Sequence, residues 1–429
     1  MATDVDVQYF SHLNGLTLGN NWGDLIRLLD KALVTGIDFT QITAASIDTQ
    51  GDVHITLYAA HNAMLFQVVE LSGFAPASLN QKYRIKGVPS ATQLILKPKT
   101  DIAERLITTI GTGKLASLGY EIIFRDTNDV KRVYRAKNPT AQHPFIRVDE
   151  SLTSLDGTTG VYTSTYAKSA MVGLLGQMTH IDDYQNPTVP QLPFDSTSPD
   201  KNWKIAGVGT SVVRGWSRWY WAANSGPTSN WGESSPVYNG QRNFTLVGDS
   251  DAFYFLRSLM PKSSGGTGAT KQNLLSGCGL FEQAITHDVT NPWFLMTTLT
   301  TFMASQSNSL TSSSYADGGG TPLGGNSPNF HVLRSNLLSD SVRVSATPIT
   351  VGSNSGVYER YKNSIAAIEI PFSDSDGYLR GVLKHVCFCG NLAGIEEVTP
   401  MISESSMYAK ECAYTSGNGG FYFYLGELE

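Results

Sequence analysis

The sequence predicts a mainly β protein, with helix confined to one segment near its start. Charged residues make up only 16% of the 429 residues, and 41 glycines suit a chain with many turns. Short runs of alternating apolar and polar residues recur between Gly, Pro, Asn and Asp, which is typical of strands. Because no period of about 20 to 50 residues repeats, solenoids and propellers are excluded.

The length of the chain fits two or three domains. We expect an N-terminal arm and an amphipathic helix over residues 1–38, followed by a small β-barrel or sandwich module over 39–100. A larger β-sandwich-like domain with long loops and insertions would occupy 101–429, with a subdivision near residue 260 as an option. The predictions for residues 1–38 and 101–429 depend only on the pattern of apolar and polar residues along the chain.

Residues 1–19 show no period and are predicted to form an extended arm. A helix is predicted over 20–36, where Asn20 or Asn21 can cap the N-terminus and Gly36 can take the left-handed position after the last turn. Its apolar face is wide enough to indicate two packing neighbours. The residues of that face are Trp22, Leu25, Ile26, Leu28, Leu29, Ala32 and Leu33.

Residues 39–98 contain about five short strands in roughly 60 residues, which favours a small barrel or sandwich. Val53, Ile55 and Leu57 alternate along one of these strands, after a turn at Gln50 and Gly51. The segment has no catalytic motif, so it is interpreted as a packing module.

The remaining chain continues with strands and long loops. A hairpin turns at residues 127–129, and a loop with four prolines covers 184–202. Two low-complexity loops rich in Gly and Ser lie at 263–271 and 312–329. We expect these loops and the arm to contact neighbouring subunits.

Composition excludes several classes of partner. A net charge of −6 without basic clusters argues against direct contact with nucleic acid or anionic membranes. No apolar run reaches the roughly 18 to 20 residues that span a bilayer, and the first ten residues lack the pattern of a secretory signal. We therefore expect a cytoplasmic protein without membrane insertion, with four free cysteines and no cofactor.

One strand offers a metal candidate. A two-residue period would place His385, Cys387 and Cys389 on the same face, and these are ligand types that zinc prefers. A fourth ligand is missing nearby, and Val386 and Phe388 make the other face apolar. Core packing is therefore favoured over a metal site.

An aromatic cluster offers a binding candidate. It consists of Trp216, Trp219, Tyr220, Trp221 and Trp231. Aromatic rings can stack on sugars or anchor an interface, but most buried aromatic residues belong to the core. Core or subunit packing is favoured, and glycan binding is the alternative.

No residue set predicts an enzyme. The paired carboxylates at 149–150 and 182–183 are adjacent in sequence, so in a strand they would point to opposite faces, and they are interpreted as turn or surface residues. The segment IGTGKLAS lacks the upstream glycine and the hydroxyl of a phosphate-binding loop, and GDSDA lacks the last glycine of a nucleophile elbow. We predict no catalytic residues.

Several stretches, in order along the chain, resemble a family of tailed-bacteriophage virion proteins. They are LNGLTLGNNWGDLIRLLDKALVTGI, HITLYAAHNAML with LNQKYRI, LGYEIIFRDTNDVKRVYRA, HPFIRVDES, NFTLVGDSDAFYFL and GYLRGVLKH. The resemblance implies a structural component of the tail or baseplate, assembled in the host cytoplasm as a symmetric oligomer with copies of itself and other virion proteins. A receptor-binding or glycan-binding tail protein, or a decoration protein of the neck or capsid, is the alternative. The tryptophan-rich insertion and the Gly/Ser loops depart from the family pattern.

Overall fold

The computed structural model describes residues 3–154, 160–207, 209–224, 234–261, 272, 274–285, 291–299, 330–333, 343–348, 367–374, 376–388, 398–412 and 420–429. The protein is mainly β, built from several antiparallel sheets, which confirms the predicted class. The predicted Gly/Ser loops lie outside the described residues. Within the described parts, no helix is both long and apolar enough to cross a membrane.

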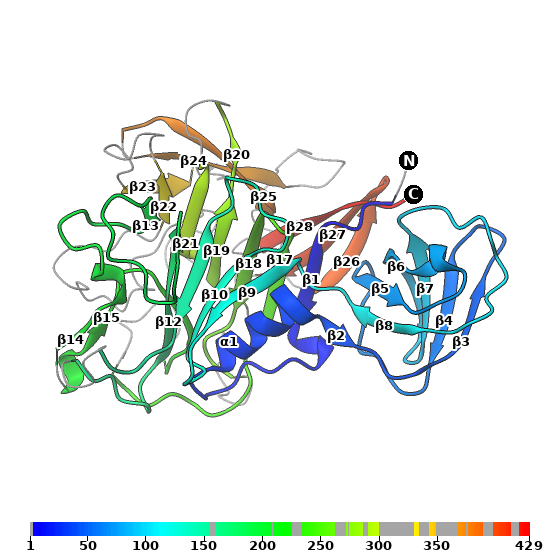
Figure 1. The fold of residues 1–429 in the computed structure, drawn as a ribbon, viewed down its shortest axis with the longest axis horizontal. Helices are drawn as coiled ribbons and strands as arrows, with labels where there is room; N and C mark the ends of the chain where they lie inside the picture. Colours follow the sequence, from blue (N-terminus) through cyan, green and yellow to red (C-terminus); the bar gives the residue numbers. More distant parts are fainter. Residues whose placement is uncertain are drawn as a thin grey trace.

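The largest sheet has thirteen strands and forms the body of the molecule (Figure 1). Its strands, in spatial order, are β1 (Gln8–Ser11), β17 (Phe244–Gly248), β18 (Ala252–Arg257), β19 (Leu274–Leu280), β21 (Trp293–Leu299), β22 (Phe330–Leu333), β23 (Arg343–Pro348), β24 (Ile368–Asp374), β25 (Leu379–Phe388), β28 (Gly420–Glu427), β27 (Ser406–Cys412) and β26 (Thr399–Ser403), and β20 (Glu282–Gln283) pairs with β25.

A six-stranded sheet packs against the largest one. Its order is β13 (Gln191–Leu192), β12 (Lys168–Leu175), β11 (Phe145–Asp149), β10 (Lys131–Ala136) and β9 (Tyr120–Arg125), with β16 (Arg218–Ala222) paired to β12. Strands β12, β13 and β16 lie against β21. The ring of Trp219 is 5.9 Å from that of Phe253 in an edge-to-face contact between the two sheets. The arrangement is the sandwich-like packing expected for the larger region.

Short elements complete the body. The proline-rich segment 184–202 is not loop throughout, because it contains β13 and the start of a 3-10 turn. The remaining elements are the two-stranded sheet β14 (Ile205–Ala206) with β15 (Val213–Arg214) and the 3-10 turns η1 (His12–Asn14), η3 (Ala77–Leu79), η4 (Lys201–Trp203) and η5 (Gly209–Ser211).

The small module is a closed barrel. Its seven strands, in order, are β2 (Ile37–Asp38), β8 (Thr112–Leu115), β5 (Val68–Ser72), β6 (Lys82–Ser90), β7 (Gln93–Pro98), β4 (Val53–Leu57) and β3 (Ile42–Ile47). Because β2 and β3 follow each other in the chain but stand at opposite ends of this order, segment 37–47 joins the two edges. The interior is tightly packed at Gly113, where a Cβ would lie 2.9 Å from the side chain of Leu71 and 3.3 Å from those of Phe39 and Ile42. The sheet extends to 115, past the predicted limit of 100.

The predicted helix is α1 (Asp24–Leu29), continued by the π-helical turn η2 (Asp30–Thr35). The predicted caps are wrong. The N-cap is Gly23, with a φ of 87°, and Gly36 has a φ of 72° but a ψ of −167°, which is not the left-handed conformation. A residue larger than glycine does not fit at position 36, because its Cβ would lie 2.1 Å from the carbonyl oxygen of Leu115.

The N-terminal arm is part of the fold. It becomes β1, which pairs antiparallel with β17 at one edge of the largest sheet. The arm therefore packs on its own chain. Its buried apolar residues are Val5, Val7, Tyr9 and Phe10.

The barrel covers the outer side of this arm. Gln67 Nε2 donates to the carbonyl oxygen of Tyr9 at 2.8 Å, and Gln8 Nε2 donates to the carbonyl oxygens of Val68 and Ala116, both at 2.8 Å. Gln67 thus binds a backbone carbonyl of the edge strand β1, and Gln8 of β1 binds two backbone carbonyls of the barrel. One edge of the largest sheet is thereby closed by the barrel.

Arg84 of β6 completes the junction between barrel and body. Its fully buried guanidinium donates to the carbonyl oxygens of Asp4 (2.9 and 2.7 Å), Val7 (2.9 Å), Phe66 (2.7 Å) and Leu425 (2.8 Å). Burial lowers the pKa of Arg84 to about 10, so it remains charged near neutral pH. The side chain joins the arm, the barrel and β28, and the two ends of the chain lie side by side there (Figure 1).

Candidate functional site in a histidine and aspartate cluster

A cluster of charged and histidine side chains begins at the hairpin between β17 and β18. Asp249 and Asp251 lie in its turn. Asp249 Oδ1 accepts hydrogen bonds from the backbone N–H groups of Asp251 (2.8 Å) and Ala252 (3.0 Å), which fixes the turn. Hydrogen bonds within the turn therefore fix the backbone that carries both aspartates.

A bulge in β25 brings two neighbouring residues to this hairpin. Pro371 of β24 pairs with Val382, but Glu369, two residues earlier, pairs with Cys387, five residues later in β25. His385 lies within this excess of chain and has a φ of 63°. Bulges redirect side chains that would otherwise alternate between faces.

Both redirected side chains reach the carboxylates of the hairpin. Lys384 Nζ lies 2.7 Å from Asp251 Oδ2, and His385 Nε2 lies 2.8 Å from Asp249 Oδ2. Consecutive residues of a regular strand could not do this, because they point to opposite faces. The bulge is therefore what assembles the site.

The third segment is the loop between β10 and β11. His143 Nε2 lies 2.9 Å from Asp251 Oδ1, and its Nδ1 accepts the backbone N–H of Thr140 at 2.9 Å. Since Nδ1 is an acceptor, the ring proton is on Nε2 and is donated to Asp251. We call Asp249, Asp251, His143, Lys384 and His385 the clasp.

The clasp lowers the pKa values of its two carboxyl groups. The hydrogen bond from His143, aided by Lys384, holds the pKa of Asp251 well below its usual range. Burial, the largest single influence, raises the pKa of Asp249, but the hydrogen bond and charge of His385 together with the backbone N–H of Ala252 outweigh it and leave that pKa lowered. Both carboxylates are ionised near neutral pH.

Two clefts flank the clasp. One, of about 300 Å³, is lined by Asp249, Glu282, Glu369, His385 and Cys387 among others. The other, of about 470 Å³, is lined by residues that include His143, Asp251 and Lys384. Besides the clasp residues, Glu282 lines both clefts, Glu369 and Tyr424 line the first, and Thr140, Gln142 and Gln283 line the second. The arrangement can hold three segments of the chain together.

The metal candidate is not assembled in the structure. His385 is bound to Asp249, Cys387 is buried in the strand beyond the bulge, and Cys389 lies outside the described residues. The two-residue period on which the prediction relied is broken by the bulge. In the part of the chain that the structure describes, no group of three His, Cys, Asp or Glu side chains is placed to hold a metal ion.

The aromatic candidate belongs to the core where it is described. Trp219, Tyr220 and Trp221 are fully buried and Trp216 is nearly so, while Trp231 lies outside the described residues. Trp221 meets Trp22, near the start of the helix, at 5.8 Å. These four rings present no face to a sugar, so their glycan-binding role is not supported.

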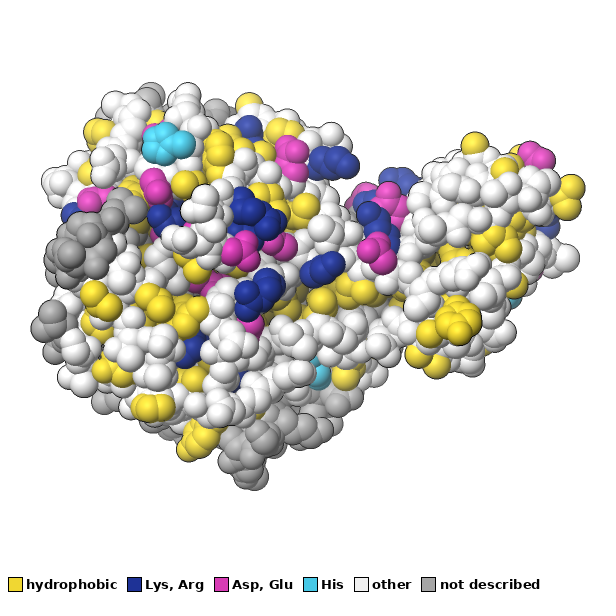
Figure 2. Space-filling model, turned by 60° about the horizontal axis from the view of Figure 1, so that its bottom comes forward, with side chains coloured by type: hydrophobic (Ala, Val, Ile, Leu, Met, Phe, Trp, Pro, Cys, Tyr) yellow, Lys and Arg dark blue, Asp and Glu magenta, His cyan; other side chains and the backbone are white. Residues whose placement is uncertain are grey.

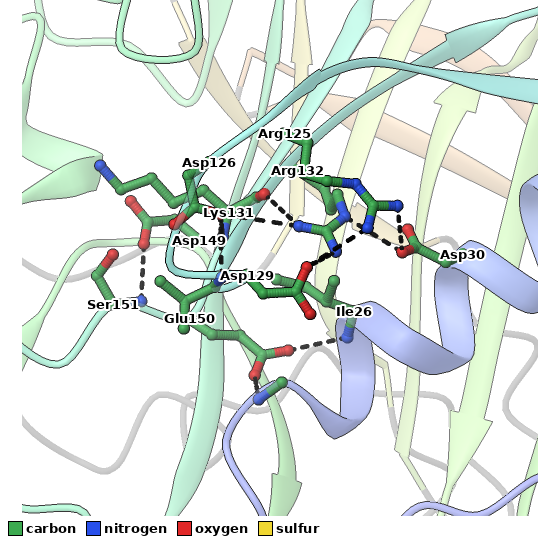
Figure 3. A network of polar contacts seen from close by, with 12 residues as sticks. Ile26, Asp30, Arg125, Asp126, Asp129, Lys131, Arg132, Asp149, Glu150 and Ser151 are labelled. Atoms are coloured by element: carbon green, nitrogen blue, oxygen red, sulfur yellow. Dashed lines mark hydrogen bonds and ion pairs between the residues drawn. The ribbon is translucent and has the colours of Figure 1, made fainter.

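The paired carboxylates differ: Asp182 lies in a part-exposed turn, as expected, whereas the assignment of the first pair to a turn or the surface is wrong. Asp149 and Glu150 are both buried. Glu150 accepts the backbone N–H groups of Gly23 and of Ile26, the latter at 2.9 Å, and so caps the first turn of α1 (Figure 3). Burial raises the pKa of Glu150 to about 8. The side chain of Glu150, directly after β11, thus replaces the cap expected from the local sequence.

Ion pairs also hold the helix against the six-stranded sheet. The buried side chain of Arg132 reaches Asp30 of the helix (3.2 Å) and also contacts Asp129 in the hairpin turn (Figure 3). Asp182 of the second pair bridges Lys131 (2.9 Å) and Arg147 (2.6 Å). Both pairs therefore serve the fold.

Sequence reasoning missed the clasp and Arg84. The segment GDSDA was considered only as a nucleophile elbow, although two aspartates around one residue between strands are a signal for a hydrogen-bonded turn. The local sequence does not indicate which side chains bind to this turn. No protein-family model matches the chain, and no curated protein sequence matches it.

Proposed function

We propose that the chain is a non-enzymatic structural subunit of a tailed-phage particle, placed in the tail or baseplate. It would assemble in the host cytoplasm into a symmetric oligomer with copies of itself and with other virion proteins. The sequence resemblance supplies the kind of particle. The proposal involves no cofactor, no direct contact with nucleic acid and no membrane insertion.

One observation supports the structural role above the others. The carboxylates of the clasp, Asp249 and Asp251, are each bound to a basic side chain of another segment of the same chain. General acid or base catalysis needs a group positioned to exchange a proton with a substrate. A cluster that uses its charges to tie three segments together serves rigidity instead.

The junction at Arg84 supports the same role. The barrel projects from the body as a separate lobe, yet side-chain hydrogen bonds fix it to the arm and to β28 (Figure 2). Charged side chains of both signs gather where the lobes meet (Figure 2), and Lys99 lies 3.6 Å from Asp6 there. A projecting lobe in a fixed orientation suits a subunit that must contact neighbours at a defined angle.

The test is to locate the chain in particles. Purified virions would be separated into heads and tails, and each fraction analysed by mass spectrometry. We expect the chain in the tail fraction, and a deletion mutant should yield incomplete particles by negative-stain microscopy. Complete, infectious particles without the chain would contradict the proposal, and presence in the head fraction would favour the decoration alternative.

A further inference from the structure

The second of the two clefts beside the clasp has the size of a small-ligand site. Its volume is about 470 Å³, within the range of pockets that bind small molecules. Part of its wall is apolar and consists of Leu280, Phe281 and Pro292. The rest of the wall is polar, with side chains from the β10–β11 loop, from the β17–β18 turn, from β20 and from β25. We call this cavity the β20 cleft.

Polar side chains of the β20 cleft keep hydrogen-bonding capacity that the described part of the fold does not use. Within that part, the exposed carboxylate of Glu282 and the exposed side-chain amide of Gln142 form no hydrogen bond or ion pair. Gln283 Oε1 is buried without a hydrogen-bond partner. Lys384 Nζ has three N–H bonds and donates one of them to Asp251 at 2.7 Å. Both donors and acceptors are therefore available to a ligand.

The segments that carry these groups are held in fixed positions. Trp293 Nε1 donates to the backbone carbonyl oxygen of Gln142 at 2.6 Å, and the N–H of Gln142 donates to Thr140 Oγ1 at 3.3 Å. β20 pairs antiparallel with β25. The clasp then joins β25 to the β10–β11 loop, because Asp251 binds both Lys384 and His143. Binding to groups on fixed segments costs less conformational entropy.

The mixture of groups in the β20 cleft indicates the kind of ligand. Asp251 and Glu282 carry two negative charges and Lys384 one positive charge, while His143 is neutral with its proton on Nε2, so anionic ligands are disfavoured. A fitting ligand must donate and accept hydrogen bonds at neighbouring positions. A hydroxyl group does both. Sugar rings present several hydroxyl groups together with an apolar face of C–H groups, which matches the apolar wall.

We propose that the β20 cleft binds a neutral saccharide. Its hydroxyl groups donate to Glu282 and Gln283 and accept from Lys384 and Gln142, and its C–H face lies toward the apolar wall. The site is distinct from the tryptophans of β16, which are buried in the core. The clasp thereby gains a second role, since it positions the loop and the strand that supply two of the four groups. This inference goes beyond the proposed function and does not depend on where in a particle the subunit lies.

The test measures binding of defined sugars to the full-length protein by saturation-transfer NMR. The probes are glucose, galactose, mannose and N-acetylglucosamine, with glucuronic acid and glycine as charged comparisons. We expect at least one neutral sugar to bind. Gln142→Ala and Gln283→Ala should each weaken that binding by about fivefold, because each removes one hydrogen bond to a neutral group. Glu282→Ala should weaken it by roughly 20-fold, because hydrogen bonds to charged groups are stronger.

Gln93→Ala is the matched control, because Gln93 is exposed on β7 of the barrel, outside the β20 cleft. It should leave sugar binding unchanged, and equal melting temperatures would show that all variants fold. Absence of binding by every neutral sugar overturns the inference, as does binding that none of the three cleft variants weakens. Tighter binding of glucuronic acid or glycine than of any neutral sugar also overturns it. The location of the chain in virions is decided separately by mass spectrometry, so failure of this inference and failure of the proposed function are distinguishable.

Discussion

The Arg84 junction and the clasp both tie distant segments together, but they use different partners. All the hydrogen bonds of the Arg84 guanidinium go to backbone carbonyl oxygens, from the arm, the barrel and β28. In the clasp, Asp249 and Asp251 bind basic side chains. Neutral acceptors do not titrate, whereas carboxylates and imidazoles do.

The comparison teaches that the two ties differ in burial as well as in partner. The Arg84 side chain is fully buried, while Asp251 is one-third exposed. Carbonyl oxygens satisfy the donors of a buried guanidinium. The carbonyl oxygens of the arm, which lack a neighbouring strand on that side, in turn gain a hydrogen-bond donor. Nearer the surface, ion pairs can form with a smaller desolvation cost. The two ties should therefore respond differently to mutation, pH and salt.

The largest effect is expected from Arg84→Met. It leaves buried carbonyl oxygens of the arm, the barrel and β28 without donors, which should lower the free energy of unfolding by about 4 kcal/mol. Urea unfolding followed by fluorescence measures this. Arg27→Met, at an exposed position on α1, is the control. A loss below about 1 kcal/mol would show that these carbonyls find other donors.

Glu150→Gln extends the comparison to a carboxylate that is buried without a basic side chain bound to it. The pKa of Glu150 is about 8 in the folded protein, above its ordinary value of about 4.3, so ionisation opposes folding as the pH rises between these values. We expect the wild type to lose on the order of 2 kcal/mol relative to Glu150→Gln between pH 5 and pH 8.

Unfolding in urea at several pH values measures that difference. The exposed Glu121→Gln is the control and should follow the wild type. A constant offset between wild type and Glu150→Gln across this range would mean that Glu150 stays ionised when folded, held by the N–H groups of Gly23 and Ile26.

Asp251→Asn tests the clasp, and here the dependence of stability on pH should run in the opposite direction. Because the folded-state pKa of Asp251 is lowered, its contribution is present above about pH 4 and is lost as the pH falls further. We expect the variant to be less stable by about 1 kcal/mol at pH 7, since solvent screens a partly exposed pair, and the difference should shrink as the pH falls below about 4. Exposed Asp101→Asn serves as the reference.

Salt should give the smallest effect. Raising sodium chloride to about 1 M shortens the screening length to about 3 Å, which should reduce the Asp251→Asn difference by a few tenths of a kcal/mol. The Arg84→Met difference should not change, because buried bonds to carbonyl groups are not screened. Equal salt dependence of the two differences in unfolding free energy would remove the distinction between the ties.

The fold class and the helix could be predicted from sequence because they depend on local periodicity. The joining of the barrel's two edges could not, since it depends on one segment, 37–47, that supplies a strand to each edge. The caps of α1 were wrong because Glu150, far along the chain, competes with the local candidates.

The site was harder to predict for a physical reason. A two-residue period assumes a regular strand, and the bulge at His385 breaks it. Asp249 and Asp251 are local to one turn, but Lys384 and His143 reach them across more than 100 residues of sequence. Only the tertiary fold determines such meetings.

The Arg84 junction also sets an order of events during synthesis. Its bond to the carbonyl oxygen of Leu425 joins residues 341 positions apart. At about 5 to 20 residues per second, β28 leaves the ribosome roughly 17 to 70 seconds after β6. Throughout that interval the nascent barrel has a guanidinium that lacks one of its acceptors, so completion of the junction marks a chain that has been translated through β28.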